Sequence, residues 1–394
     1  MIYTLEYDYS QGMYETDWLD TLKRTGLKYK TLVNDMLTGD HVISNKRYLE
    51  SSIDYLQSIL TEDDYLLMDS AFIFQHPDVV ALKIEDVYKL IREKLKYKKI
   101  LIFHPDNGHG DTGGSDIEFI WPWYKANWSI EKCKSQYNMY LNNTGKNKNR
   151  WLNMLLSIRF QDMMRYKHFQ FTNGVFKEHR TLLYGYLKKD GYLDKCFTSY
   201  LGYDIQGQSA PKYKDHFKSL NTNRLSNDEY EEIVKDLPIV LDFPSWGGNV
   251  GQDSNMIPYS SNSYFHLVGC TNYEQYNKMN ENPIYTSEKI FKPYLSWQIP
   301  IFFGVAGLYR TLKKLGFDVF EDLFDMSFDS ELDNMKRFEL QYKNVEKIAK
   351  MDRNSVHQVY RTRLHRIENN FKNLEELSEN YVDVLKKKLD GSEA

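Results

Sequence analysis

The sequence predicts an α/β protein, in which parallel strands alternate with helices. In the first half, a buried strand at Asp64–Asp69 is followed by helical spacing of apolar residues at Ile84–Leu95 and by a second strand at Lys99–His104. In the second half, a strand at His168–Phe171 precedes a helix at His179–Leu187. Strand, helix and strand in this order are typical of the layered α/β class.

A third observation is the stretch from 284 to 304, which predicts a helix followed by a strand. Thr286 or Ser287 can cap the helix, and apolar residues recur along it at spacings of four and three. Ile299–Phe303 is a short apolar run closed by Gly304, as expected for a buried strand. The rest of the chain is organised around this unit.

The remaining elements follow from local pattern. We predict strands at Tyr3–Tyr9, Leu27–Val33, Ile239–Asp242 and Tyr264–Val268, a turn at Asn173–Gly174, and helices from residue 18 to Gly26 and at 308–315. Residues 115–165 are aromatic and predicted to be helical, residues 205–230 to be an irregular polar insertion, and residues 331–389 to be a pair of packing helices. The expected domains are 1–165, 166–330 and 331–394.

Composition bounds the class of protein. A chain of 394 residues is long enough for about two domains, and a net charge of -4 gives no global field toward nucleic acid. Its 31 Tyr and 21 Phe can line sites that stack on sugars or bases. Cys133, Cys196 and Cys270 form no CxxC pair, which favours a reducing compartment and argues against zinc. With neither a signal peptide nor a membrane span in sight, we expect a cytoplasmic protein without a membrane partner.

The helix predicted after Thr286 begins with charged residues. Glu288 and Lys289 fall in its first turn, where free N–H groups and the positive end of the helix dipole favour an anion such as phosphate. Lys292 is the next polar residue. A solvated first turn on an ordinary helix is the alternative.

A loop rich in polar residues follows the strand at Lys99–His104. Ligands of open α/β sheets lie at the carboxyl ends of strands. Asp106 or Asp111, with His109 as a rival, can therefore act as general base on an acceptor hydroxyl. The spacing matches no standard metal set. A polar flexible turn is the alternative.

Three further segments are candidates. Arg180, at the start of a helix, can clamp a pyrophosphate or form surface salt bridges. The glycine-rich loop 246–251 is a weak phosphate-loop signal because it lacks the spacing of a fingerprint. The basic segments 92–99 and 146–167 suit phosphodiesters or a solvated helix face.

Two of these segments resemble a known family. Residues 284–329, with a Thr-x-Glu-Lys helix start and a strand ending in Gly304, and residues 171–200, with a His-Arg pair opening a helix, resemble glycosyltransferases of tailed phages and large viruses. The first segment is also similar to the donor-binding motif of fucosyltransferases. The resemblance covers the second half of the chain only.

The resemblance implies a GT-B fold, in which two Rossmann-like domains face a central cleft and C-terminal helices pack on them. It implies a nucleotide-diphosphate sugar as donor, with no metal or other cofactor required. Glu288 would hold the donor ribose, and Lys289 and Arg180 the diphosphate. The implied donor-binding residues are Asn173, His179, Arg180, Tyr285, Thr286, Glu288, Lys289 and Lys292.

The sequence departs from the family at two places. Cys270 stands where the family carries Glu, and Asp325–Met326 where it carries Asp-Glu. The acceptor is open between a hydroxymethylated base of phage DNA and a hydroxyl of a protein or glycan. A non-catalytic GT-B-like binding protein and a nucleic-acid-binding module are the alternatives from other classes.

Overall fold

A computed structural model describes residues 2–6, 26–33, 54, 57–61, 64–69, 93, 99–103, 117–120, 162–203, 210–220, 222, 224–241, 257–270, 273 and 288–390. These residues fall into two compact units. The first comprises the described residues up to 120 together with those from 376 onward, and the second comprises those from 162 to 375. The last described residues of the chain therefore belong to the first unit.

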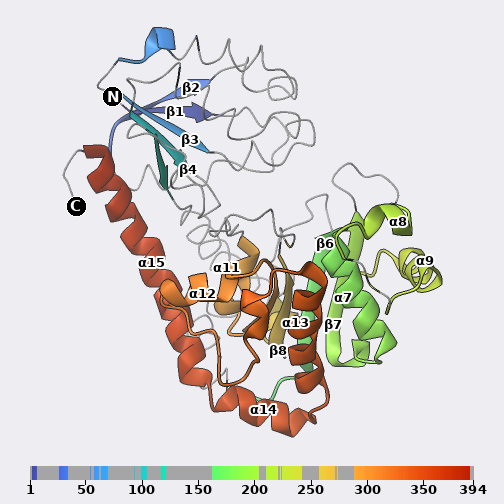
Figure 1. The fold of residues 1–394 in the computed structure, drawn as a ribbon. Helices are drawn as coiled ribbons and strands as arrows, with labels where there is room; N and C mark the ends of the chain where they lie inside the picture. The colour runs from blue at the N-terminus through green and yellow to red at the C-terminus, as the bar shows by residue number, and fades with distance from the viewer. Residues whose placement is uncertain are drawn as a thin grey trace, which may run out of the picture. The chain divides into compact units, whose positions relative to one another are not determined.

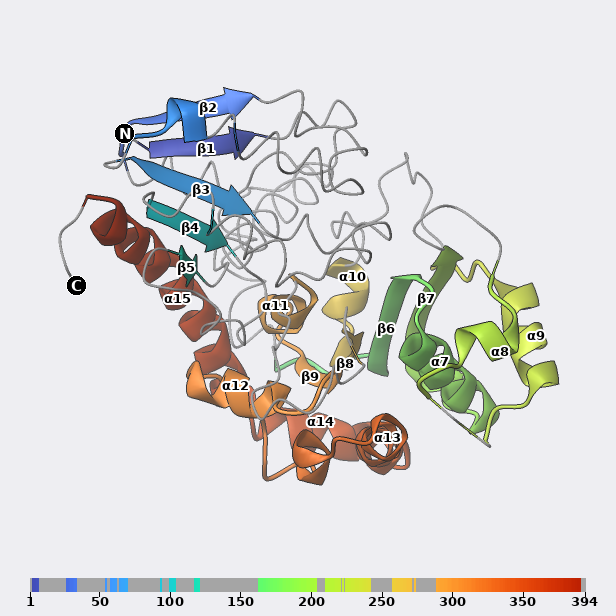
Figure 2. The same ribbon diagram turned by 45° about the horizontal axis from the view of Figure 1, so that its top comes forward.

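The first unit is built on a five-stranded sheet. Its strands are β1 (Ile2–Glu6), β2 (Tyr29–Val33), β3 (Tyr65–Asp69), β4 (Lys99–Phe103) and β5 (Ile117–Ile120). All pairs are parallel and the order is β2-β1-β3-β4-β5, as Figure 2 shows. This is an order of doubly wound α/β sheets, in which the chain reverses direction between β1 and β3.

The second unit holds a four-stranded parallel sheet. It consists of β6 (Lys167–Val175), β7 (Cys196–Tyr203), β8 (Ser263–Gly269) and β9 (Ile299–Phe303), in the order β7-β6-β8-β9. Every residue of β8 and β9 is buried. Continuous burial explains the uninterrupted apolar run of β9, since helices cover both faces of such a sheet.

Helices follow the strands of the second unit (Figure 1). They are α7 (Glu178–Lys189), α8 (Tyr213–His216), α9 (Asn227–Asp236), α10 (Ile257–Ser260), α11 (Glu288–Leu295), α12 (Leu308–Lys314), α13 (Asn334–Ala349), α14 (Arg353–Arg361) and α15 (Leu364–Asp390). Among the described residues, no helix combines the length and the apolar character that a membrane span requires.

Adjacent residues of β9 show how the helices divide between the two faces of the sheet. Phe302 packs against Tyr294 of α11 and Tyr309 of α12, whereas Phe303 packs against Phe338 of α13. Successive side chains of a strand point to opposite faces. Helices α11 and α12 therefore cover one face, and α13 covers the other together with α7, whose Tyr186 contacts Phe338.

The structure corrects several sequence-based expectations. Residues 117–120, within the segment predicted to be helical, form β5. Asn173 and Gly174 belong to β6, where an irregularity in the pairing with β7 lies between Asn173 and Val175. The helix α9, residues 227–236, begins inside the region 205–230 that was predicted to be irregular. In the predicted strand at Ile239–Asp242, Ile239 makes only an isolated bridge to Tyr200. Three helices, not two, follow residue 331. The strand β7 was not predicted.

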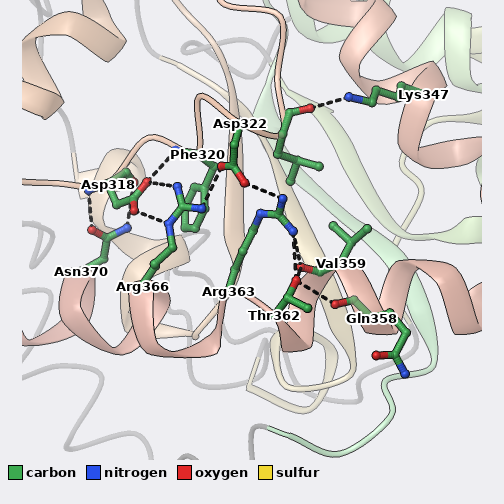
Figure 3. A network of polar contacts seen from close by, with 11 residues as sticks. Asp318, Phe320, Asp322, Lys347, Gln358, Val359, Thr362, Arg363, Arg366 and Asn370 are labelled. Atoms are coloured by element: carbon green, nitrogen blue, oxygen red, sulfur yellow. Dashed lines mark hydrogen bonds and ion pairs between the residues drawn. The ribbon is translucent and has the colours of Figure 1, made fainter.

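The start of α15 is anchored to the second unit by a polar network (Figure 3). Arg366 donates to both carboxylate oxygens of Asp318 and, at 2.8 Å, to Asp322 Oδ1. Arg363 reaches the other oxygen of Asp322 at 2.6 Å. Asn370 exchanges two hydrogen bonds with the backbone of Asp318, at 2.7 and 2.9 Å. The long helix thus leaves the second unit from a fixed base.

Candidate functional site

The carboxyl ends of β6 and β8 define the expected ligand position in the second unit. From β6 the chain crosses through α7 to β7, and from β8 it passes through α11 to β9, which lies on the opposite side. The two connections diverge between β6 and β8, and such a switch point is where open α/β sheets bind ligands. Asn173, Gly269 and Cys270 lie there, at or just after the strand ends.

Arg180, in the first turn of α7, lies across this edge. Its side chain is buried, and its guanidinium donates to backbone oxygens after both strands: Nε to Gly269 (3.1 Å), Nη2 to Cys270 (3.0 Å) and Nη1 to Val175 (3.2 Å). The predicted diphosphate clamp is therefore also a structural tie between the β6 and β8 ends. It brings a positive charge to the switch point.

Asn173 lies beside Arg180. The residue is 8% exposed, and its Nδ2 has no hydrogen-bond partner among the described residues. A Cβ placed on Gly269 would lie 2.9 Å from Asn173 Oδ1 and 2.6 Å from Arg180 Cγ. The glycine therefore lets both polar side chains approach the backbone of β8. A buried amide donor without a partner is costly unless a ligand or water takes it up.

His179 is the third predicted residue at this edge, and it is held in the neutral form. Its Nε2 lies 2.9 Å from the Cys270 oxygen. Because a carbonyl only accepts, Nε2 carries the proton and donates. Burial lowers the pKa of His179 well below its usual value, and the adjacent Arg180 lowers it further. The imidazole stacks on Tyr273 at 4.8 Å between ring centroids. It positions the chain after β8 and does not titrate near neutral pH.

The thiol of Cys270 is subject to the positive charge of two residues. Its thiol is buried, and burial raises its pKa to about 12 although Arg180 and Lys289 both oppose that rise. The thiol is therefore protonated at neutral pH. Arg180 of α7 and Lys289 of α11 thus both act electrostatically on this sulfur.

The start of α11 supplies the lysines. Glu288 is the first helical residue, and Lys289 and Lys292, three positions apart, lie on one side of the helix with partly buried side chains. Lys292 acts on His266 in the middle of β8, where burial first and then this lysine lower the histidine pKa to about 3. Lys289 thus acts electrostatically on Cys270 at the end of β8, and Lys292 acts on His266 within β8.

The other predicted residues lie outside the described part of the chain. They are Asp106, His109, Asp111, Tyr285 and Thr286, the side chain of Glu288, the glycine-rich loop 246–251 and nearly all of the basic segments. The strand β4 ends at Phe103, so the predicted base loop follows directly the carboxyl end of an interior strand of the first sheet. These assignments remain predictions.

Sequence reasoning did not find Tyr273, Arg337 and Asp329. Arg337 is fully buried and binds the loops after β8 and β9, and Asp329 accepts from the first backbone N–H groups of α12. Arg337 lies within a charged helical pattern that resembles a solvated face, which is why its role was not evident. The capping role of Asp329 was not predicted, because this residue lies far along the chain from the start of the helix that it caps.

No metal site is evident in the part of the chain that is described: no group of three or more His, Cys, Asp or Glu side chains there is placed to hold an ion. Comparison of the chain with protein-family models, with curated proteins and with solved structures found no match. The site must therefore be interpreted from its own residues.

Proposed function

We propose that this protein is a GT-B glycosyltransferase, which moves a sugar from a nucleotide-diphosphate sugar to an acceptor hydroxyl. One observation carries the proposal. Asn173 of β6 and Arg180 of α7 lie against the backbone of residues 269–270 at the switch point of a parallel sheet, and Lys289 of α11 acts electrostatically on Cys270 there. A buried amide donor and two cations at helix N-termini suit a diphosphate.

The architecture supports the same proposal. Each unit contains an open parallel sheet with a doubly wound order, and the last part of the chain belongs to the first unit. The GT-B fold pairs two such domains and carries C-terminal helices. The acceptor would use the first domain, with Asp106 or Asp111, or His109 as the rival, as general base.

The chemistry needs two kinds of groups. A base takes the proton from the acceptor hydroxyl as it attacks the sugar, and positive groups stabilise the negative charge that develops on the departing diphosphate. Lys289 and the N-terminus of α11 would supply the second kind, and Glu288 would hold the donor ribose. Arg180 would contribute its positive charge while its guanidinium donates hydrogen bonds to the backbone at the ends of β6 and β8.

Nucleotide binding tests the proposal. UDP, GDP, CMP and TDP, each with its common sugar conjugates, are titrated by calorimetry into the wild-type protein and Lys289→Ala. We expect one nucleotide to bind and Lys289→Ala to weaken it at least about tenfold, the effect of losing one charged contact. Lys313→Ala is the control, because that lysine pairs only with the exposed Glu321 among the described residues. Failure of every nucleotide to bind the wild type would refute the proposal.

A nucleotide-binding protein without turnover is the second candidate, favoured by the neutral thiol of Cys270 at a carboxylate position. Release of free sugar from the bound donor, measured without acceptor, distinguishes the two. Turnover to water supports the enzyme, whereas tight binding with no sugar release supports the binding protein. Acceptor assays with hydroxymethylated DNA, and with protein and glycan hydroxyls, then identify the acceptor.

A further inference from the structure

Arg337 on α13 is a buried cation whose hydrogen-bonding capacity is filled by loops of the second unit. A guanidinium has five N–H donors. Each has an acceptor here: Nε donates to Gly304 O (3.1 Å), Nη1 to Glu331 O (3.0 Å) and Leu332 O (3.4 Å), and Nη2 to Tyr273 O (2.6 Å) and Asn334 Oδ1 (2.7 Å). One side chain thus joins the chain after β8 to the chain after β9.

Tyr273 is held from several directions. Arg337 binds its backbone oxygen and lies over its ring at 4.7 Å from the centroid, and His179 stacks on the same ring. Its buried hydroxyl lies 3.0 Å from Gln341 Oε1 and 3.2 Å from the oxygen of Asn334. Tyr273 is therefore fixed to α13 by hydrogen bonds and to α7 by the ring stack.

Tyr273 lies close in the sequence to a residue of the candidate site. Cys270, whose oxygen accepts from Arg180 and His179, lies three residues before Tyr273. The Cys270 amide donates to Phe303 O at 3.0 Å, so the same segment is also tied to the end of β9, beside Gly304. A loss of the contacts at Tyr273 would free the backbone that faces Asn173 and Arg180.

We propose that Tyr273 and Arg337 are positioning residues for the nucleotide site, which hold the chain after β8 in the conformation that the diphosphate meets. The inference rests on the proposed function. Neither residue needs to touch the ligand. Preorganised binding groups lose less entropy on binding, so loosening this segment weakens affinity without removing a contact.

The opposite end of the sheet offers a matched control. Tyr360 on α14 donates to Trp297 O at 2.7 Å, just before β9, and accepts from Arg165, just before β6. Tyr360→Phe and Tyr273→Phe each remove one buried hydroxyl and nothing else. They differ in the edge of the sheet that they affect: amino-terminal for Tyr360 and carboxyl-terminal for Tyr273.

The test compares affinity with stability in Tyr273→Phe, Arg337→Met, Arg337→Lys and Tyr360→Phe. The nucleotide that binds the wild type is titrated into each, and Tm is measured alongside. We expect Tyr273→Phe and Arg337→Met to bind about tenfold more weakly. Arg337→Lys does not restore binding, because an ammonium has three donors in place of five. Tyr360→Phe lowers Tm and leaves affinity unchanged.

A second readout requires no ligand. Hydrogen exchange of the Cys270 amide should be faster in Tyr273→Phe and Arg337→Met than in Tyr360→Phe. If Arg337→Met does not fold, Tyr273→Phe alone decides. Wild-type affinity and an unchanged Cys270 exchange rate in Tyr273→Phe would overturn the inference. If the wild type binds no nucleotide, the proposed function fails, and the exchange rates still decide whether the two residues hold this segment.

Discussion

The side chain of Arg180 passes so close to Gly269 that a Cβ on the glycine would lie 2.6 Å from Arg180 Cγ. The position therefore excludes every other residue unless the arginine moves. Arg180 cannot move freely, because its guanidinium donates to three backbone oxygens around the strand ends.

We accordingly predict that Gly269→Ala lowers the free energy of unfolding by about 1–3 kcal/mol, the usual cost of overpacking, and abolishes nucleotide binding. Urea unfolding and calorimetry measure the two effects. Gly191→Ala is the control: it forces a side chain into a positive φ of 72° in open space, at a cost of about 1–2 kcal/mol, far along the chain from the strand ends. Retention of nucleotide binding in Gly269→Ala would contradict the assignment of the site.

Much of the fold of the second unit could be predicted because its strands and helices have strong local patterns. The predicted strand at Tyr264–Val268 lies within β8, and the predicted strand at Ile299–Phe303 coincides with β9. Both strands are fully buried, and β9 is an uninterrupted apolar run. β7 was missed since Cys196–Tyr203 contains threonine, serine and glycine and shows no clear alternation; its place in the sheet depends on pairing with β6.

The candidate site could be predicted only in part. Arg180 and Lys289 could be proposed from the sequence because helix starts are evident in a sequence and favour anions. Asn173 was assigned to the donor through the family resemblance but was placed in a turn, because Asn-Gly is a strong turn signal; in the structure it continues β6. Tyr273 and Arg337 are 64 residues apart in sequence, and no local pattern indicates their contact.

The helix α9 offers a stability test of a signal that was overlooked. Ser226 Oγ accepts from the Glu229 amide at 3.2 Å, and the Glu229 carboxylate accepts from the Ser226 amide at 2.7 Å, which is a capping box. We predict that Ser226→Ala lowers the free energy of unfolding by about 1 kcal/mol. Ser355→Ala is the control, because Asp352 remains as the cap of α14. Equal stability of the two variants in urea would show that the cap contributes nothing.

The network at the start of α15 predicts a salt-dependent loss of stability. Arg366→Lys cannot form the paired hydrogen bonds to Asp318 and the contact to Asp322 at once. Because these groups are about one-third to one-half exposed, we expect a cost of only about 1 kcal/mol, reduced at high salt by screening. Urea unfolding at low and high salt measures it. Nucleotide affinity should be unchanged, and a weaker affinity would show that the network also acts on the site.

The buried histidines predict that stability falls in acid. Burial lowers the pKa of His266 to about 3, and burial also lowers that of His216 to about 4. In the unfolded chain histidine titrates at about pH 6.5. The unfolded state therefore binds more protons below that pH, so the stabilisation is complete above about pH 6.5 and is lost as pH falls toward the folded-state pKa values.

Removing His266 should flatten this dependence. In His266→Gln, the slope of the free energy of unfolding against pH should decrease by about 1.4 kcal/mol per pH unit at pH values between about 4 and 6. This is the slope that results when the unfolded state binds one more proton than the folded state. Urea unfolding across that range measures the slope. His365→Gln is the matched control, since that side chain is 87% exposed. An unchanged slope in His266→Gln would mean that the unfolded and folded states bind the same number of protons at this residue, and that His266 is not held neutral within the sheet.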